Sequence, residues 1–321
     1  MTSRSVSITG ATGFVGYHLA QKFQESGWTV RAVVRPGSAK PLPEGVAAVQ
    51  APLVKARLEP AFAGADLVVH AAAAIRAPSD LAFVATNVDG TRAVVEAANA
   101  AGARLLHLSS VAAIGPASAA APAREDDAPH PINGYGRSKL AGEEVVRTEA
   151  RTPWTIVRPS AVYGPRDRGF LPLFRMARRG LFLYAAPPAT AFTFVHVEDL
   201  VDALLRAASD DRAIGRTFFV GHPEPVTTEV LLRTIAEAEG KPYRPRSVAP
   251  IALDAAAALG ELAWRIGRPP LLDRGRLAEL QSGGFVCAVD RIRDGLGFVA
   301  TIPIRDGIER TARAYRECGW L

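Results

Sequence analysis

The chain has 321 residues, of which 48% are hydrophobic and 22% charged, a balance typical of folded globular proteins and unlike that of disordered, collagen-like or low-complexity chains. This length suits about two domains or one large α/β unit. The net charge is +6, and most of the basic residues are scattered along the chain. One dense group is interpreted as a solvated helix face or an anion-binding patch; it consists of Arg166, Arg168, Arg175, Arg178 and Arg179. Nucleic-acid binding is not expected.

Predicted strands and helices alternate through the first 165 residues. The strands are expected at 5–9, 28–34, 46–49, 67–70, 104–108 and 154–157, and the helices after the glycine-rich turn at 10–16, around 55–63, at 81–101 and at 135–149. Each crossover is long enough to carry a helix, which implies parallel strands covered on both faces. The sequence therefore predicts an α/β fold, a doubly wound parallel (Rossmann) sheet, over residues 1–165.

Residues 166–321 predict a smaller, mostly helical C-terminal substrate lobe. A strand at 192–195, a helix at 197–208 and a strand at 217–220 indicate that this lobe is partly interleaved with the first domain. An apolar helix is expected at 251–266, which is too short and too charged to span a bilayer. It is expected to line the entrance of a pocket or to touch a membrane surface, and both roles stay open.

Three glycines follow the first predicted strand and open the first predicted helix. Gly10, Gly13 and Gly16 allow a tight turn and a close backbone approach to a pyrophosphate, whose charge meets free N–H groups at the helix N-terminus. The spacing alone is weak, but its place between a first strand and a first helix is where this fold binds nucleotides. A dinucleotide cofactor is therefore expected.

Tyr135 and Lys139 are four residues apart on a predicted helix, so the phenol and the ammonium project from one face. A nearby cation is expected to lower the pKa of the tyrosine and make it a proton donor or acceptor near neutral pH. Ser109 and Ser110 lie at the carboxyl end of the strand at 104–108, the edge where ligands bind in such sheets.

Four segments together resemble an extended short-chain dehydrogenase/reductase of the NAD-dependent epimerase/dehydratase superfamily. They are Thr9 to Gly16, Ser109-Ser110, Tyr135 to Lys139, and Arg158 to Pro165, in the family's order. The resemblance covers roughly residues 5–220. It implies a catalytic triad in which Ser110 binds the substrate oxygen, Tyr135 exchanges its proton, and Lys139 holds the cofactor ribose and tunes the tyrosine.

The resemblance also implies cofactor contacts: Gly10, Thr12, Gly13, Phe14, Val15, Gly16, Leu53, Ala71, Ala72, Ala73, Tyr135, Lys139, Pro159 and Val162. Arg35 ends the second strand where an acidic residue would accept the ribose 2′-OH of NAD, and an arginine there accommodates the 2′-phosphate of NADP. NADP is expected, while NAD and a solvated loop role for Arg35 stay open. His70 is expected to be a packed strand residue, and Asn87 to organise the active-site strands.

The segments Tyr163 to Asp167 and Phe170 to Phe174 look like the branch of 3β-hydroxysteroid dehydrogenases and dihydroflavonol reductases, and the tail Tyr315 to Leu321 like hopanoid-associated epimerase-like proteins. We therefore expect an NADP-dependent oxidoreductase interconverting a secondary alcohol and a ketone on a hydrophobic small molecule. Val111, Phe170 and Phe192 are expected in its substrate pocket. A sugar-nucleotide 4-epimerase with bound NAD is the alternative, and a non-catalytic dinucleotide-sensing protein a third reading.

Cys287 and Cys318 lie far apart and lack metal-ligand spacing, so neither a disulfide nor a metal site is expected. No apolar run is long enough for a signal core or an integral membrane segment. The sequence predicts a cytoplasmic protein, and a homodimer through the helices at 81–101 and 135–149 is left open.

Overall fold

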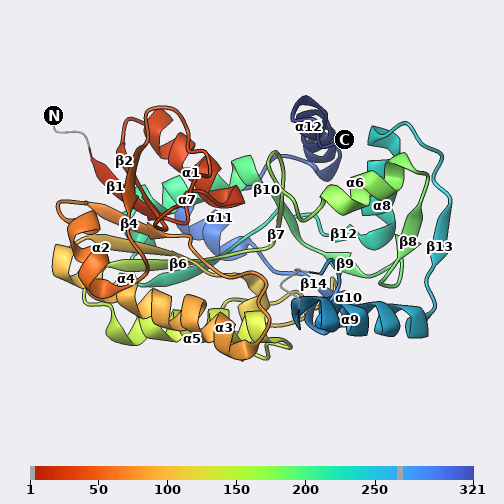
Figure 1. The fold of residues 1–321 in the computed structure, drawn as a ribbon, viewed down its shortest axis with the longest axis horizontal. Helices are drawn as coiled ribbons and strands as arrows, with labels where there is room; N and C mark the ends of the chain where they lie inside the picture. The colour runs from red at the N-terminus through yellow and green to blue at the C-terminus, as the bar shows by residue number, and fades with distance from the viewer. Residues whose placement is uncertain (1–3, 266–269) are drawn as a thin grey trace.

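The computed structural model describes residues 4–265 and 270–321 (Figure 1). The largest sheet in the described part of the chain has seven parallel strands. Their order is β11-β6-β5-β4-β1-β2-β3. The bounds are β1 Ser5–Thr9, β2 Thr29–Val34, β3 Ala47–Gln50, β4 Leu67–His70, β5 Arg104–Leu108, β6 Trp154–Pro159 and β11 Arg216–Val220. The doubly wound parallel sheet expected from the sequence is confirmed.

Helices cover both faces of this sheet (Figure 1). On one face lie α2 Lys55–Phe62, α4 Gly90–Ala101 and α5 Gly134–Glu149; on the other lie α1 Phe14–Glu25, α7 Val197–Ser209 and α11 Asp290–Leu296. The C-terminal half of the chain thus supplies an edge strand and two helices of this layered unit.

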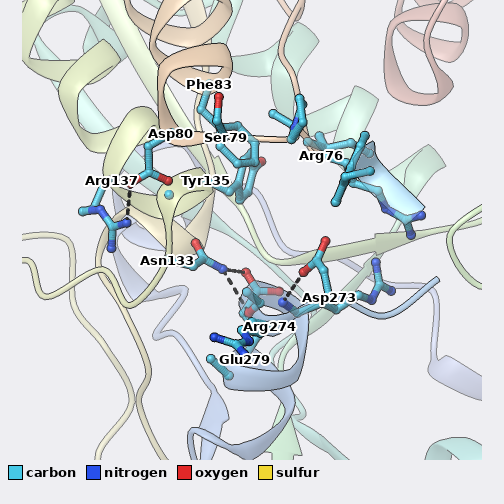
Figure 2. A pocket seen from close by; sticks show the side chains of 18 of the residues that line it. Arg76, Ser79, Asp80, Phe83, Asn133, Tyr135, Arg137, Asp273, Arg274 and Glu279 are labelled. Atoms are coloured by element: carbon cyan, nitrogen blue, oxygen red, sulfur yellow. Dashed lines mark hydrogen bonds and ion pairs between the residues drawn. The ribbon is translucent and has the colours of Figure 1, made fainter. Parts of the chain in front are cut away.

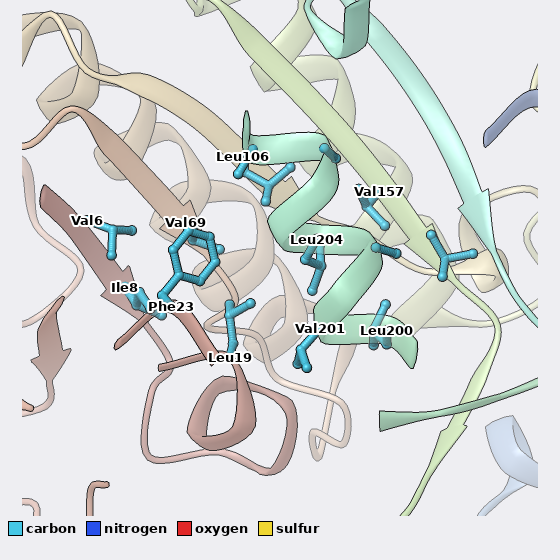
Figure 3. Close-up of a cluster of buried hydrophobic side chains, with 14 of the residues drawn as sticks. Val6, Ile8, Leu19, Phe23, Val69, Leu106, Val157, Leu200, Val201 and Leu204 are labelled. Atoms are coloured by element: carbon cyan, nitrogen blue, oxygen red, sulfur yellow. The ribbon is translucent and has the colours of Figure 1, made fainter. Parts of the chain in front are cut away.

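Side chains alternate along the strands and divide the core into two layers. In β4, Val69 faces the layer with α1 and α7, whereas Val68 faces the layer with α2 and α4. Figure 3 shows the first layer, in which Phe23 of α1 and Leu204 of α7 pack against the sheet. Because both faces are buried, the strands are apolar on both sides.

The predicted long helix at 81–101 is interrupted. It consists of α3 Asp80–Val84, the π-helical turn η1 Ala85–Asp89 and then α4. Asn87 lies in the π-helical turn, where its side chain bonds to a neighbouring loop and to α5. Apolar periodicity gives no sign of such a turn, because only the hydrogen-bonding pattern of the backbone changes.

The remaining elements form a second, smaller set beside the sheet. They are β7 Ala161–Tyr163, α6 Leu171–Arg178, β8 Phe182–Tyr184, β9 Ala191–Phe192, β10 Phe194–His196, β12 Val226–Thr227, α8 Thr228–Ala238, β13 Pro245–Ser247, α9 Pro250–Arg265, α10 Arg274–Gln281, β14 Gly284–Phe285 and α12 Ile304–Glu317, with short 3₁₀ turns η2 Val111–Ala113 and η3 Asp211–Ala213. Within the described residues, no helix has both the length and the apolar character needed to cross a membrane.

Two expectations for this region need comment. The strand expected at 192–195 is wrong as one element, because β9 pairs with β12 and β14 whereas β10 pairs with β7. Thr193 separates them, and its backbone and side chain bond to the segment at 285–287. The apolar helix expected at 251–266 is present as α9, and Ile266 lies outside the described residues.

Candidate active site

The glycine-rich turn after β1 lies at the carboxyl edge of the sheet, beside the segment that follows β4. Gly10 has φ of +78°, and a Cβ added to it would lie 2.6 Å from the backbone nitrogen of Ala72. A Cβ on Gly16 would lie 2.1 Å from the Gly10 carbonyl oxygen. Glycine is therefore required at both positions, and the turn packs directly on Ala71 and Ala72.

The first turn of α1 leaves backbone donors available. Its N-cap, Gly13, offers no side-chain cap, so the N–H groups of Phe14 and Val15 have no acceptor within the helix. A Cβ on exposed Gly13 would point into this space, 3.1 Å from the Gly10 carbonyl. This uncapped N-terminus, with Thr12 in the preceding turn, fits the pyrophosphate of a dinucleotide.

Other predicted cofactor residues lie along the same edge. Arg35 is exposed directly after β2, next to the end of β1. Leu53 is half-buried against Gly90 at the start of α4. Pro159 ends β6, and Val162 lies in β7, paired with β10. Their positions fit a molecule extended across the ends of the strands.

The predicted triad meets at the ends of β5 and α5. The Ser110 side chain lies near enough to the Tyr135 hydroxyl to act on its ionisation, and its Oγ accepts from the Ala112 N–H. Lys139, one turn further along α5, is 2% exposed and donates from Nζ to the Leu108 carbonyl, 2.7 Å away. The structure therefore brings Ser110, Tyr135 and Lys139 into one cluster.

Burial controls the acidity of these groups. It raises the pKa of Tyr135 to about 12, while Ser110 acts to lower it and the charge of Glu279 raises it further. The expectation that Lys139 lowers this pKa is wrong for the protein alone, because desolvation is the larger effect. Burial also lowers the pKa of Lys139 to about 8, against the opposing charge of Glu143.

Asn87 and His70 position the loops around the triad. Asn87 accepts from the Ala74 N–H and donates to the Ser138 hydroxyl, which joins the segment after β4 to α5. Thr91 Oγ1 donates its proton to the Asn87 carbonyl, so this hydroxyl must accept from Nε2 of His70. The neutral imidazole of His70 therefore carries its proton on Nε2, and its Nδ1 accepts from the Thr9 hydroxyl. Both residues are buried, and the sequence predicts this packing for His70.

Glu143, which the sequence analysis missed, anchors a buried ion-pair network one turn after Lys139. Its carboxylate accepts from both Nε and Nη2 of Arg158, from Arg147 and from the Ser109 hydroxyl. Burial acts to raise the pKa of Glu143, but Arg158 and these other partners hold it below its usual value. The i, i+4 spacing after Tyr135 and Lys139 was a usable signal for this residue.

A cavity of about 550 Å³ opens beside Tyr135 (Figure 2). Its wall combines the apolar side chains of Ile75, Phe83, Ile132 and Trp264 with the charged side chains of Arg76, Asp273, Arg276 and Glu279. The Phe83 and Tyr135 ring centroids are 6.1 Å apart. The cavity is therefore divided between apolar and charged surface, which differs from the mainly apolar pocket expected from the sequence.

The three residues predicted for the substrate pocket lie elsewhere. Val111 is buried against Ile114 and Phe219, and Phe192 packs partly against that cluster and partly against Phe194. Phe170 packs on Tyr163 and Phe194. None of these three lines the cavity beside Tyr135 as the described residues define it.

Comparison with known proteins agrees with this geometry. The model of the NAD dependent epimerase/dehydratase family matches residues 6–221. The ceramide reductase of Caulobacter vibrioides is 32% identical over 98% of this chain and 96% of its own. The 4-hydroxy-2-methyl-3-oxo-4-farnesyl-3,4-dihydroquinoline-1-oxide ketoreductase of Stigmatella aurantiaca is 28% identical over 96% and 95%.

A solved structure, MoeE5 in complex with UDP-glucose and NAD, has a TM-score of 0.77 and 26% identity, and covers 98% of this chain and 99% of its own. The glycine turn, the sheet order and the full-length similarity lead to one assignment. The chain belongs to the NAD dependent epimerase/dehydratase family and is an NAD(P)-dependent enzyme of the extended short-chain dehydrogenase/reductase type.

Proposed function

We propose that the protein is an NADP-dependent oxidoreductase that interconverts a ketone and a secondary alcohol on a hydrophobic small molecule, through Ser110, Tyr135 and Lys139. The observation that carries the proposal is Tyr135, which lies near Ser110 and lines a cavity of about 550 Å³ at the start of α5. Two relatives are named as reductases of a ceramide and of a farnesyl-bearing quinoline oxide, and both compounds carry apolar chains.

Ser110, Tyr135 and Lys139 have separate roles in this reaction. Ser110 and Tyr135 hold the substrate oxygen between their hydroxyls, and in reduction Tyr135 donates its proton to that oxygen. In oxidation the phenolate takes the proton back. Lys139 provides a positive charge near the phenol, anchored to the Leu108 carbonyl. The bound dinucleotide supplies the hydride chemistry.

The test is a cofactor-oxidation assay with purified protein. We expect NADPH consumption with ketones that carry an aliphatic or isoprenoid chain, measured beside sterol, flavonoid, keto-acid and sugar-nucleotide panels. Consumption with a nucleotide sugar and with none of the ketones would contradict the proposal.

Sugar-nucleotide 4-epimerisation is the second candidate, favoured by one observation: Arg76 and Arg276 both line the cavity, and their charges suit a diphosphate. Micromolar binding of UDP to the cofactor-loaded protein in calorimetry would support it.

Two finer points belong to the same proposal. NADP is preferred over NAD because exposed Arg35 directly follows β2 and no acidic residue stands there. Two copies pair through α4 and α5, which sedimentation of the purified protein tests.

A further inference from the structure

Glu279 lies on α10 and faces the cavity that holds Tyr135 (Figure 2). Its Oε1 accepts a hydrogen bond from Nδ2 of Asn133, at 2.7 Å. Its charge is the smallest of three effects on the pKa of Tyr135 and acts to raise it. Glu279 and Tyr135 line the same cavity, so one bound molecule can contact both side chains.

The acceptor capacity of Glu279 is only partly used. The described residues offer no hydrogen bond to its second oxygen, Oε2, although an ionised carboxylate can accept about four. Two charged neighbours act on it electrostatically: Arg276 lowers its pKa and Asp273 raises it, while burial is the larger effect and raises it. A substrate that fills the cavity displaces water from this carboxyl group and must then replace the lost hydrogen bonds.

We propose, on the basis of the reductase function above, that Glu279 accepts a hydrogen bond from a hydroxyl or amide N–H that the substrate carries next to its reacting carbon. The substrate class is then a ketone or secondary alcohol with a neighbouring polar donor and an apolar remainder. The donor meets Glu279, and the apolar part meets Ile75, Phe83 and Trp264. A ketone without the donor leaves the second carboxyl oxygen, Oε2, desolvated and without a hydrogen bond, and the site discriminates against it.

A purely structural role for Glu279 has a different signature. Asn133 caps α5 by accepting from the Gly136 N–H, and it also donates to Glu279 and to the Gly275 carbonyl. Glu279 thereby helps to attach α10 to the start of α5. If this were its whole contribution, removing it would impair every substrate to the same extent.

The test compares three medium-chain aliphatic ketones that differ at one position: an α-hydroxyketone, the corresponding α-acetamidoketone and the parent ketone. With NADPH, the wild type is expected to favour at least one donor-bearing ketone over the parent by about 10- to 100-fold in kcat/KM, the range for a hydrogen bond to a charged group. Glu279→Ala should reduce this preference to near unity. Glu279→Gln, which retains an acceptor but no charge, should keep a smaller preference.

Gln281→Ala is the matched control, because Gln281 is exposed on the same helix and outside the cavity. Thermal melting shows whether each variant is folded, and NADPH titration shows whether it binds the cofactor. If the alanine variant does not fold, the substrate preference of the glutamine variant tests the inference. Equal rates of the wild type on all three ketones, or an unchanged preference in the variants, would overturn the inference and leave the reductase function intact. Reduction of none of them by the NADPH-loaded wild type overturns the proposed function and the inference with it.

Discussion

Burial opposes the ionisation of the Tyr135 hydroxyl more strongly than Ser110 favours it. Burial raises its pKa to about 12, and nearby Glu279 adds to the effect. At neutral pH the phenol is therefore protonated, which suits a group that gives a proton to a forming alkoxide. For the proposed reaction this protonation state suits reduction, whereas oxidation requires a lower pKa of Tyr135.

Tyr135→Phe should abolish turnover and leave cofactor binding nearly unchanged. The substitution removes the proton donor and keeps the ring that packs beside Phe83. General acid–base catalysis contributes about 10²- to 10⁴-fold, so kcat should fall by that factor. Steady-state kinetics and NADPH titration measure the two quantities, and a rate within a few-fold of wild type would remove Tyr135 from its proposed role.

Lys139 should make stability depend on pH in a defined window. Its pKa is about 8 in the folded protein and 10.5 when unperturbed. Below the folded value both states are protonated, and the penalty for burying the charge is fully present. Between the two values the unfolded state binds more protons, so this group makes stability rise with pH by up to about 1.4 kcal/mol per unit.

The measurement compares denaturant unfolding of wild type and Lys139→Met at about pH 7 and about pH 9.5. The wild type should gain free energy of unfolding relative to the variant at the higher pH. Because other titrating groups are common to both proteins, they largely cancel in the difference. A difference that does not change with pH contradicts the lowered pKa.

Arg35 should determine which dinucleotide binds. Arg35→Asp is expected to weaken NADP strongly and NAD little, because a carboxylate repels a 2′-phosphate and accepts from a 2′-OH. The side chain is exposed, so the substitution should leave the fold unchanged. Calorimetric titration of both cofactors into both proteins tests this, and a wild type that already prefers NAD refutes the assignment.

At the scale of an element, α5 connects the reaction site to the protein interior. Tyr135, Lys139, Glu143 and Arg147 follow one another at four-residue spacing, from the cavity to the ion-pair network. Asn133 caps the start of the helix, and Arg158 of β6 holds Glu143 through two bonds. The helix that carries Lys139 is therefore held in place both before this residue, at the Asn133 cap, and after it, at Glu143.

Glu143→Gln should destabilise the protein and slow catalysis. The change leaves the buried guanidinium of Arg158 without its anionic partner, and breaking a buried pair costs about 3–5 kcal/mol. Glu144→Gln is the matched control, since Glu144 is exposed at the next position. Its free energy of unfolding should stay within about 0.5 kcal/mol of wild type. Equal unfolding free energies for the two variants would show that the network contributes little.

The elements differ in how far local sequence predicts them. The parallel sheet is predictable from alternating strands and helices, and the shared helix face of Tyr135 and Lys139 from residue spacing, because both depend on neighbours along the chain. The π-helical turn at Ala85–Asp89 and the division between β9 and β10 depend on hydrogen bonds to distant segments. Glu279 reaches the site from a helix more than a hundred residues after Tyr135, and no local pattern reports such a contact.

At the scale of the whole molecule, the cavity is assembled from three distant stretches of chain. Residues 75–83 follow β4, residues 132–137 lie at the start of α5, Glu261 and Trp264 lie on α9, and residues 273–279 cap and begin α10. The Arg76 guanidinium donates to the Pro270 carbonyl across this assembly. The cavity therefore depends on the packing of the C-terminal helices against the sheet unit, whereas the glycine-rich turn is built from the sheet unit alone.

Because the glycine-rich turn and the cavity are built from different parts of the chain, a change at the turn should alter the stabilisation by bound cofactor more than the stability of the ligand-free protein. Gly13 is exposed, with φ of −81°, so alanine can adopt its backbone conformation, and the new Cβ meets only the Gly10 carbonyl at 3.1 Å. Gly13→Ala should therefore melt near the wild-type temperature without ligand.

NADPH should raise the melting temperatures of the wild type and Gly13→Ala by different amounts. At a hundredfold excess over its Kd, a ligand that binds only the folded state stabilises it by about 2.7 kcal/mol. The wild type should show the corresponding rise in Tm, and Gly13→Ala a much smaller one, because the methyl group occupies the space over the uncapped N-terminus of α1. Thermal scans over a range of NADPH concentrations measure the shift. An equal shift in both proteins would place the pyrophosphate away from this turn, since a ligand held elsewhere would not sense the added methyl group.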